Sequence, residues 1–336
     1  MTLKVFEAFA GVGAQRMALR NLGIEHEVVG ISEVDRFAIQ SYEAIHGETL
    51  NFGDISKINP NELPDFDLFT YSFPCQDLSV AGKQQGMIKG QTRSGLLYEC
   101  EKIIETKRPK YLLLENVRNL ISKRFNPAFL EWQSYLNTLG YTNYVQVLNA
   151  KDYGIPQSRQ RVFMISILGE HQPYEFPQSI PLQTHLLDLL ETSVDEKMYF
   201  YLKPNKPSER LTSYLTQVQT LTKQLPHNER ISGVDKSLNH PKFIQIANCL
   251  TAREDSGISN RSGEGTAVVS TDPFSVRKLT PLECWRLMGF LDEDYVKAQN
   301  SGISNGQLYK QAGNSIVVPV LEGIFRELFQ TNQNFD

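Results

Sequence analysis

Apolar segments of strand length alternate with amphipathic segments of helix length through the first half of the chain. The strand-like segments are short runs of mostly apolar residues, and they lie at 3–10, 28–32, 67–72, 111–115, 144–148 and 162–168. Three segments between them, 14–22, 36–46 and 96–107, carry apolar residues at helical spacing. Strands that alternate with helices of this length predict an α/β fold with a doubly wound, mostly parallel sheet.

The pattern changes at about residue 176, where prolines and polar residues become frequent and the alternation stops. Helical spacing returns at 280–288 and 316–329, and the last helix is so apolar on one face that we expect it to pack against the large domain. The sequence therefore predicts four parts, which are a large α/β domain at 1–175, a smaller irregular domain at 176–273, a hinge and junction at 274–310, and a C-terminal helix at 311–336.

Composition narrows the class of protein without giving its function. The chain of 336 residues is 40% hydrophobic and 21% charged, and no apolar run reaches the length of a membrane span. Its four cysteines lie far apart and form no CxxC pair, so neither a zinc site nor a disulfide framework is expected. The first residues enter a strand directly and leave no room for a signal peptide, which favours a cytoplasmic protein. With a net charge of −4, binding to nucleic acid would require basic groups gathered on one face.

A single cysteine stands where a buried strand should end. Pro74, next to Cys75, stops the ladder after the segment 67–72, because proline has no N–H to donate. The thiol is then held in a loop at a strand end, where functional groups of open α/β sheets lie. Free cysteine is otherwise among the most buried residue types, so a core position is the alternative interpretation.

Residues near two later strands favour a chemical role for this cysteine. Glu115 and Asn116 follow one apolar run, and Arg159 and Arg161 precede another. A thiolate, a carboxyl group and two arginines together suit attack on a ring that must be protonated as it is attacked.

A glycine turn joins the first strand to the first helix. Residues 9–13 read Phe-Ala-Gly-Val-Gly, and glycine there lets backbone N–H groups approach a ligand at the start of the helix. The loop lacks the third glycine of the dinucleotide fingerprint, which argues against NAD and a dehydrogenase. An adenosine ligand without a pyrophosphate, such as S-adenosylmethionine, fits better.

Two acidic residues extend this candidate cofactor site. Glu33 ends the second strand, 20 residues after Gly13, where a carboxylate commonly holds ribose hydroxyls. Asp54 is expected to accept from the exocyclic amine of adenine, and Ile55 to pack on the ring. The alternative interpretation is a pair of surface acids and an ordinary turn.

Together these residues resemble the DNA (cytosine-5) methyltransferases of bacterial type II restriction–modification systems. The resemblance covers nearly the whole chain, and its blocks follow the family's order at 9–13, 33, 54–55, 73–76, 93–96, 115–117, 157–161, 277–290 and 311–320. Several blocks look most like those of the CpG-methylating enzymes of mollicutes. The middle of the second region does not match them, so CpG specificity is not implied.

The resemblance implies a Rossmann-like, S-adenosylmethionine-dependent methyltransferase domain at 1–175 and a target-recognition domain at 176–273. The cofactor is S-adenosylmethionine, the product is S-adenosylhomocysteine, and no metal is needed. The residues expected to bind the cofactor are Phe9, Gly11, Val12, Gly13, Glu33, Val34, Asp54, Ile55, Pro74, Leu96 and Asn314.

The resemblance also implies roles in catalysis. Cys75 would attack C6 of a cytosine flipped out of the duplex, because this chemistry cannot reach a stacked base. Glu115, beside Asn116, would hold or protonate N3 and contact the exocyclic amine. Arg161 would hold the edge of the target base, and Arg159 would favour the thiolate of Cys75 and fix nearby groups.

Two segments are expected to contact DNA. The loop 76–93 is basic, rich in glycine and next to Cys75, which suits a lid that closes on DNA, although such sequences are more often solvated surface loops. The segment 247–252 stands where the family often has a Thr-Leu pair that contacts the backbone, with Cys249 in place of threonine. The residues expected to bind DNA are Gln76, Lys83, Gln84, Arg93, Thr251, Arg253, Asn260 and Arg261.

The expected partner is double-stranded DNA, bound by a monomer of bacterial or phage origin that protects host DNA beside a separate restriction endonuclease. The alternative is an RNA (tRNA) cytosine-5 methyltransferase, but the Cys-Phe-Thr signature of that branch does not occur. A silent DNA-binding homologue would be expected to lack Cys75, Glu115 or Arg161, and all three are present.

Overall fold

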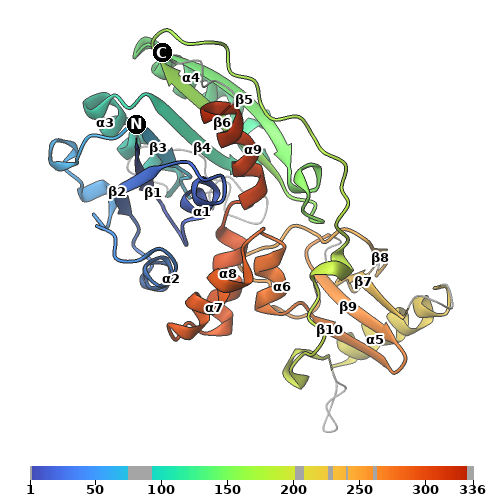
Figure 1. Ribbon diagram of the computed structural model, residues 1–336. Helices are drawn as coiled ribbons and strands as arrows, with labels where there is room; N and C mark the ends of the chain where they lie inside the picture. Colours follow the sequence, from blue (N-terminus) through green and yellow to red (C-terminus); the bar gives the residue numbers. More distant parts are fainter. Residues whose placement is uncertain are drawn as a thin grey trace. The chain divides into compact units, whose positions relative to one another are not determined.

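The computed structural model describes residues 2–74, 93–200, 208–225, 230–239, 241–259 and 263–330 (Figure 1). They form two compact units. The first unit comprises Met1–Asn149, Gln160–Ser179 and Val318–Asp336, and the second comprises Ala150–Arg159 and Ile180–Val317. The functional boundaries expected at residues 175, 273 and 310 stay predictions.

The first unit contains a six-stranded sheet with the order β2-β1-β3-β4-β6-β5. Its strands are β1 (Leu3–Ala8), β2 (His26–Ser32), β3 (Leu68–Tyr71), β4 (Tyr111–Val117), β5 (Tyr141–Asn149) and β6 (Gln160–Leu168). The first four strands run parallel, whereas β6 pairs antiparallel with both β4 and β5. The carboxyl ends of β1 to β4 and the start of β6 therefore meet at one edge of the sheet.

Helices cover both faces of this sheet, which confirms the doubly wound α/β fold predicted from the sequence (Figure 1). They are α1 (Ala14–Asn21), α2 (Arg36–His46), α3 (Leu97–Lys107), α4 (Asn126–Thr138) and α9 (Val318–Phe329). Phe69 and Tyr71 pack in one core cluster with Cys100 of α3 and Trp132 of α4. On the other face α1 packs against α9, and a hydrogen bond of 2.8 Å joins Asn21 and Glu322.

The second unit contains a four-stranded antiparallel sheet with the order β10-β9-β7-β8 where the sequence predicted irregular structure. Its strands are β7 (Ile231–Asp235), β8 (Phe243–Ile244), β9 (Thr266–Thr271) and β10 (Phe274–Lys278). One face packs on α5 (Glu209–Thr222), whose Tyr214 and Val218 are fully buried. The strands were missed because they are two to six residues long and stand among polar loops without helix-strand alternation.

Three further helices follow in the second unit, α6 (Pro281–Arg286), α7 (Asp292–Asn300) and α8 (Asn305–Asn314). Trp285 of α6 is fully buried and donates from Nε1 to the carbonyl of Leu308 at 3.0 Å. Short 3-10 helices occur at Ile55–Lys57, Pro60–Glu62, Arg93–Leu96, Arg118–Ile121, Ala150–Tyr153, Leu186–Leu189 and Glu196–Met198. In the described parts of the chain, no helix is both long enough and apolar enough to cross a membrane.

Candidate active site

The glycine loop between β1 and α1 is a tight, left-handed turn. Phe9, Gly11 and Gly13 have φ values of 56°, 57° and 80°. A Cβ on Gly13 would lie 2.4 Å from Nε2 of His46, whereas one on Gly11 would meet nothing within 4 Å. Gly13 is therefore required by the packing of α2, and Gly11 leaves open space in which a ligand can approach the backbone.

Glu33 closes this loop from the end of β2. Its Oε2 accepts from the N–H of Gly11 at 2.9 Å, and its Oε1 accepts from Val34 and Asp35, both at 2.8 Å. A carboxylate has about four acceptor sites, so three backbone bonds orient the group and leave capacity for a ligand hydroxyl. Its expected role with ribose stays a prediction.

Asn51 is a site residue that the sequence reasoning missed. Its Oδ1 accepts from the N–H groups of Glu33 (3.2 Å) and Gly53 (2.9 Å), and its Nδ2 donates to the carbonyl of Glu33 at 3.1 Å. Ser32 adds a hydrogen bond from Oγ to the carbonyl of Gly53 at 2.7 Å. These contacts hold the turn before Asp54 against the end of β2. The available signal was an asparagine two residues before a glycine, which is typical of turns.

Asp54 and Ile55 lie directly after that turn. The carboxylate of Asp54 accepts from the hydroxyl and N–H of Ser56. These hydrogen bonds lower the pKa of Asp54, and the bond from the hydroxyl has the larger effect. Ile55 is only 4% exposed and packs in the core of the first unit. Their expected contacts with adenine stay predictions.

The other expected cofactor residues differ in exposure. Val34 is 70% exposed, which leaves an apolar side chain at the end of β2, and Val12 is buried. Pro74 and Leu96 are partly buried, the latter at the N-terminus of α3. Asn314 is exposed at the end of α8 in the second unit, so its expected contact with the cofactor stays a prediction.

Glu115 and Arg161 form an ion pair at the same edge of the sheet. Arg161 lies opposite Val117 in the antiparallel pairing of β4 with β6, so Glu115, two residues earlier, shares its face. The Nε of Arg161 lies 3.2 Å from Oε1 of Glu115, and the side chains are 17% and 11% exposed. A largely shielded carboxylate that an arginine holds in place can form directed contacts with a polar ring.

Asn116 points to the other face of β4 and fixes the segment before Cys75. Its Nδ2 donates to the carbonyl of Phe73 at 3.0 Å, and its Oδ1 accepts from the N–H of Val117 at 2.9 Å. Cys75 itself lies outside the described residues. The amide of Asn116 therefore positions the carbonyl of Phe73, two residues before the expected nucleophile.

Arg159 is 3% exposed and belongs to the second unit. Its guanidinium donates to the carbonyls of Leu250 (2.8 Å), Gly313 (2.9 Å) and Ser315 (2.7 Å). These bonds join separate segments of that unit at Leu250, Gly313 and Ser315. The expected effect of Arg159 on the thiol of Cys75 stays a prediction.

The expected DNA-binding residues are only partly described. Thr251 and Arg253 are exposed on one turn of the second unit, and Arg93 begins a 3-10 helix. Gln76, Lys83, Gln84, Asn260 and Arg261 lie outside the described residues. Among the residues that are described, no group of three or more His, Cys, Asp or Glu side chains is placed to hold a metal ion.

The fold is that of a Rossmann-like methyltransferase. The chain matches the crystal structure of the S. pombe Dnmt2 methyltransferase with a TM-score of 0.71, over 99% of this chain and 100% of that chain. The sequence identity is 20%, so this likeness concerns the fold alone.

Sequence comparisons then give the family. The family model of C-5 cytosine-specific DNA methylases matches residues 3–330. The type II methyltransferase M2.ScrFI of Lactococcus lactis subsp. cremoris is 41% identical, over 98% of this chain and 99% of its own length. The orphan methyltransferase M.SPBetaI of Bacillus phage SPbeta is 33% identical, over 99% of this chain and 98% of its own length. The chain therefore belongs to the C-5 cytosine-specific DNA methylase family and is a DNA cytosine-5 methyltransferase, as the resemblance predicted.

Proposed function

We propose that this enzyme transfers a methyl group from S-adenosylmethionine to C5 of a cytosine that is flipped out of a short double-stranded DNA site. The observation that carries the proposal is the Glu115–Arg161 pair, with 3.2 Å between Oε1 and Nε. It stands at the edge of the sheet where β1 and β2 deliver the glycine loop and Glu33.

The residues around the glycine loop fit S-adenosylmethionine. The backbone at Gly11 is open to a ligand, the carboxylate of Glu33 lies against it, and the side chain of Val34 offers an exposed apolar surface to a ring. Asp54 would accept from the exocyclic amine of the adenine. Bound there, S-adenosylmethionine would supply an electrophilic methyl group on a sulfonium.

Covalent attack makes the target carbon reactive. The thiolate of Cys75 would add to C6 of cytosine. The electron pair of the C5=C6 double bond would then form C4=C5, and the pair of C4=N3 would move onto N3, which takes a proton and leaves C5 nucleophilic. Glu115 would hold or deliver that proton, because Arg161 keeps its carboxyl group in one orientation. After methylation N3 gives up its proton, a base removes the C5 proton, and the thiolate of Cys75 leaves as the C5=C6 double bond forms again.

The proposal also covers the oligomeric state of the enzyme and the purpose of the methylation in the cell. Among the relatives are a type II methyltransferase and an orphan methyltransferase of a phage. We infer that the enzyme acts as a monomer and protects host DNA from a separate restriction endonuclease. Size measurement in solution and resistance of methylated DNA to that endonuclease would test these two points.

The decisive experiment is bisulfite sequencing of DNA from a methylation-free bacterial host that expresses the wild type or Cys75→Ser. Methylated cytosines in one short motif, lost with Cys75→Ser, are the expected result. Soluble Cys75→Ser protein that still binds S-adenosylmethionine is the control for folding. If wild-type protein binds S-adenosylmethionine but modifies no DNA motif, RNA becomes the substrate to test.

A further inference from the structure

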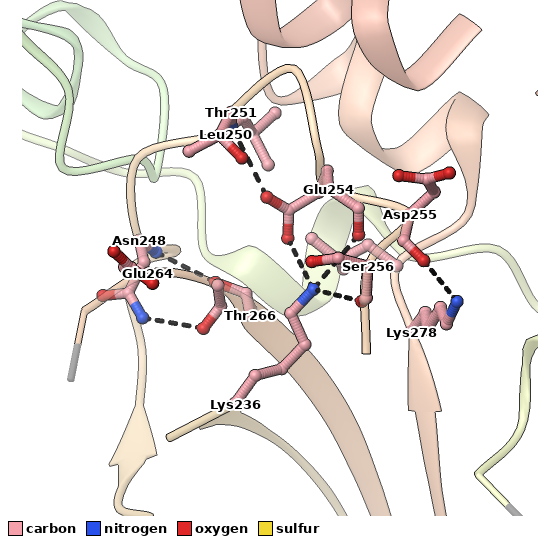
Figure 2. A network of polar contacts seen from close by, with 12 residues as sticks. Lys236, Asn248, Leu250, Thr251, Glu254, Asp255, Ser256, Glu264, Thr266 and Lys278 are labelled. Carbon is pink, nitrogen blue, oxygen red and sulfur yellow. Dashed lines mark hydrogen bonds and ion pairs between the residues drawn. The ribbon is translucent and has the colours of Figure 1, made fainter. Parts of the chain in front are cut away.

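A buried ion pair in the second unit calls for a functional account. Lys236 follows directly after β7, and its Nζ lies 3.1 Å from Oε1 of Glu254 (Figure 2). The two side chains are only 3% and 2% exposed. Moving two charges out of water costs free energy that their attraction often fails to offset, so such a pair is weak evidence for stability. What the pair holds in place is more informative.

Lys236 holds the backbone of the turn 251–256. Its Nζ donates to the carbonyls of Glu254 at 3.1 Å and Ser256 at 3.4 Å, in addition to the ion pair (Figure 2). The ammonium group thus has two backbone acceptors on a single turn, and the carboxylate on the same turn is its ion-pair partner. Glu254 also closes the turn, because its N–H donates to the carbonyl of Thr251 at 3.2 Å.

The aliphatic part of the Lys236 side chain packs directly against the backbone of Gly265. A Cβ on Gly265 would lie 2.2 Å from Cε and 3.0 Å from Nζ of Lys236. The N–H of Lys236 donates to the carbonyl of Gly265 at 3.1 Å, so the two strands that flank the stem are tied together. Its aliphatic part is therefore confined, and the ammonium group is held in one place.

The same turn is fastened from its other end. Leu250 donates from its N–H to Oε1 of Gln157 at 3.0 Å, and its carbonyl accepts from Arg159 at 2.8 Å. A Cβ on Gly313 would lie 2.2 Å from the carbonyl carbon of Thr251, so α8 packs directly on the turn. Lys278 donates to the carbonyl of Asp255 (Figure 2).

Exposed side chains stand on this anchored backbone. Thr251 and Arg253 are exposed, and the Oγ1 of Thr251 accepts from the N–H of Arg253 at 3.3 Å. We propose that Lys236 and Glu254 are positioning residues for target recognition, which fix the turn 251–256 so that Arg253 meets the DNA duplex in one orientation. This inference rests on the proposed function.

The physical reason lies in the geometry of base recognition. An arginine distinguishes guanine by two parallel hydrogen bonds to N7 and O6, which require a defined position of its backbone. A backbone that moves would let the same side chain reach phosphates or neighbouring bases, which carry less sequence information. A buried pair that holds the turn through its carbonyls therefore limits which bases Arg253 can reach.

The test compares methylation of the mapped target duplex with duplexes that carry single base-pair changes. The full-length variants are Lys236→Met, Glu254→Gln and the double variant, and each is also assayed for S-adenosylmethionine binding and thermal melting. The double variant buries no unpaired charge, so we expect it to fold and to bind S-adenosylmethionine within about twofold of wild type. Its preference for the target over altered sites should fall about tenfold or more at one or two base pairs.

A second buried pair in the same unit supplies the matched control. The Nη2 of Arg277 lies 2.8 Å from Oε1 of Glu283, and the two side chains are 7% and 0% exposed. The double variant Arg277→Met/Glu283→Gln should change the melting temperature without changing the preference for the target. If the Lys236/Glu254 double variant prefers the target duplex over altered duplexes as strongly as the wild type does, the proposal is overturned.

Arg253→Ala keeps the proposal testable if the pair variants do not fold. It should relax discrimination at particular base pairs, and any folded pair variant should relax the same ones. Uniform weakening on every duplex with Arg253→Ala would indicate a phosphate contact and overturn the proposal. If the wild type methylates no duplex, the proposed function itself fails, which is a separate result.

Discussion

The Nε of Arg161 lies 3.2 Å from Oε1 of Glu115, on two strands that the sheet pairs antiparallel. Because Arg161 is opposite Val117, the two side chains are diagonal neighbours on one face. The orientation of the carboxylate is thus set by strand register and does not depend on a loop.

Arg161→Lys should therefore impair catalysis while binding of S-adenosylmethionine stays unchanged. Lysine keeps the charge but loses the planar group that orients Glu115, so we expect kcat to fall by about 100-fold. Single-turnover methyl transfer to DNA measures this effect. Arg118→Lys is the control, since Arg118 is exposed in the same unit and bonds Gln160 at 2.7 Å. A wild-type rate for Arg161→Lys would contradict the assigned role.

Asn116→Ala should both destabilise the protein and slow the reaction. Loss of the Nδ2 donor leaves the carbonyl of Phe73 unpaired in a buried site, at a cost of about 1–3 kcal/mol. The segment before Cys75 also loses its anchor, so kcat should fall while the affinity for S-adenosylmethionine stays the same. Denaturant unfolding and rate measurements test the two effects, with the exposed Asn61→Ala as control. Wild-type stability in Asn116→Ala would count against the contact.

Gly13→Ala should abolish cofactor binding or folding, whereas Gly23→Ala should be mild. Both residues have positive φ, at 80° and 67°, and so share a backbone cost of about 1–2 kcal/mol. Only at Gly13 would the new Cβ collide, 2.4 Å from Nε2 of His46 and 2.7 Å from Cε2 of Tyr42. Calorimetric titration with S-adenosylmethionine and thermal melting separate the two variants. Equal behaviour would mean that the collision is relieved by movement of α2.

Glu7→Gln should stabilise the protein more as the pH rises. Burial raises the pKa of Glu7 from 4.5 to about 7, against the opposing hydrogen bond from Tyr42 (2.7 Å) and the charge of Arg16. The fold therefore favours the protonated carboxyl group. The free energy of unfolding that Glu7 contributes in this way is full below about pH 4.5 and is lost as the pH rises to about 7.

Glutamine does not ionise and still accepts from Tyr42. The gain in unfolding free energy of Glu7→Gln over wild type should thus grow between about pH 5 and about pH 8, toward ~3 kcal/mol at most. Denaturant unfolding at several pH values measures it. A difference that does not change with pH would show that Glu7 does not titrate in this range.

The sequence predicted the parts of the fold and site that depend on local pattern. Alternating apolar runs identified the strands of the first unit, and Glu33 was found because it directly follows one of them, β2. Asn51 was missed, because its bonds to Glu33 and Gly53 depend on how a loop returns to β2. Lys236 and Glu254 were missed for a similar reason, since nothing local predicts that two charges 18 residues apart will be buried together.

The β5–β6 hairpin of the first unit has its connection, Ala150–Arg159, in the second unit. The second unit is therefore not one contiguous segment of the chain, and a chimera that exchanges it has to take this connection into account. A chimera that exchanged only the segment 180–273 would keep Gln157 and Arg159, whose bonds to Leu250 would then have to be made to a foreign backbone. Transplanting the hairpin connection together with that segment keeps these hydrogen bonds between residues of one parent protein.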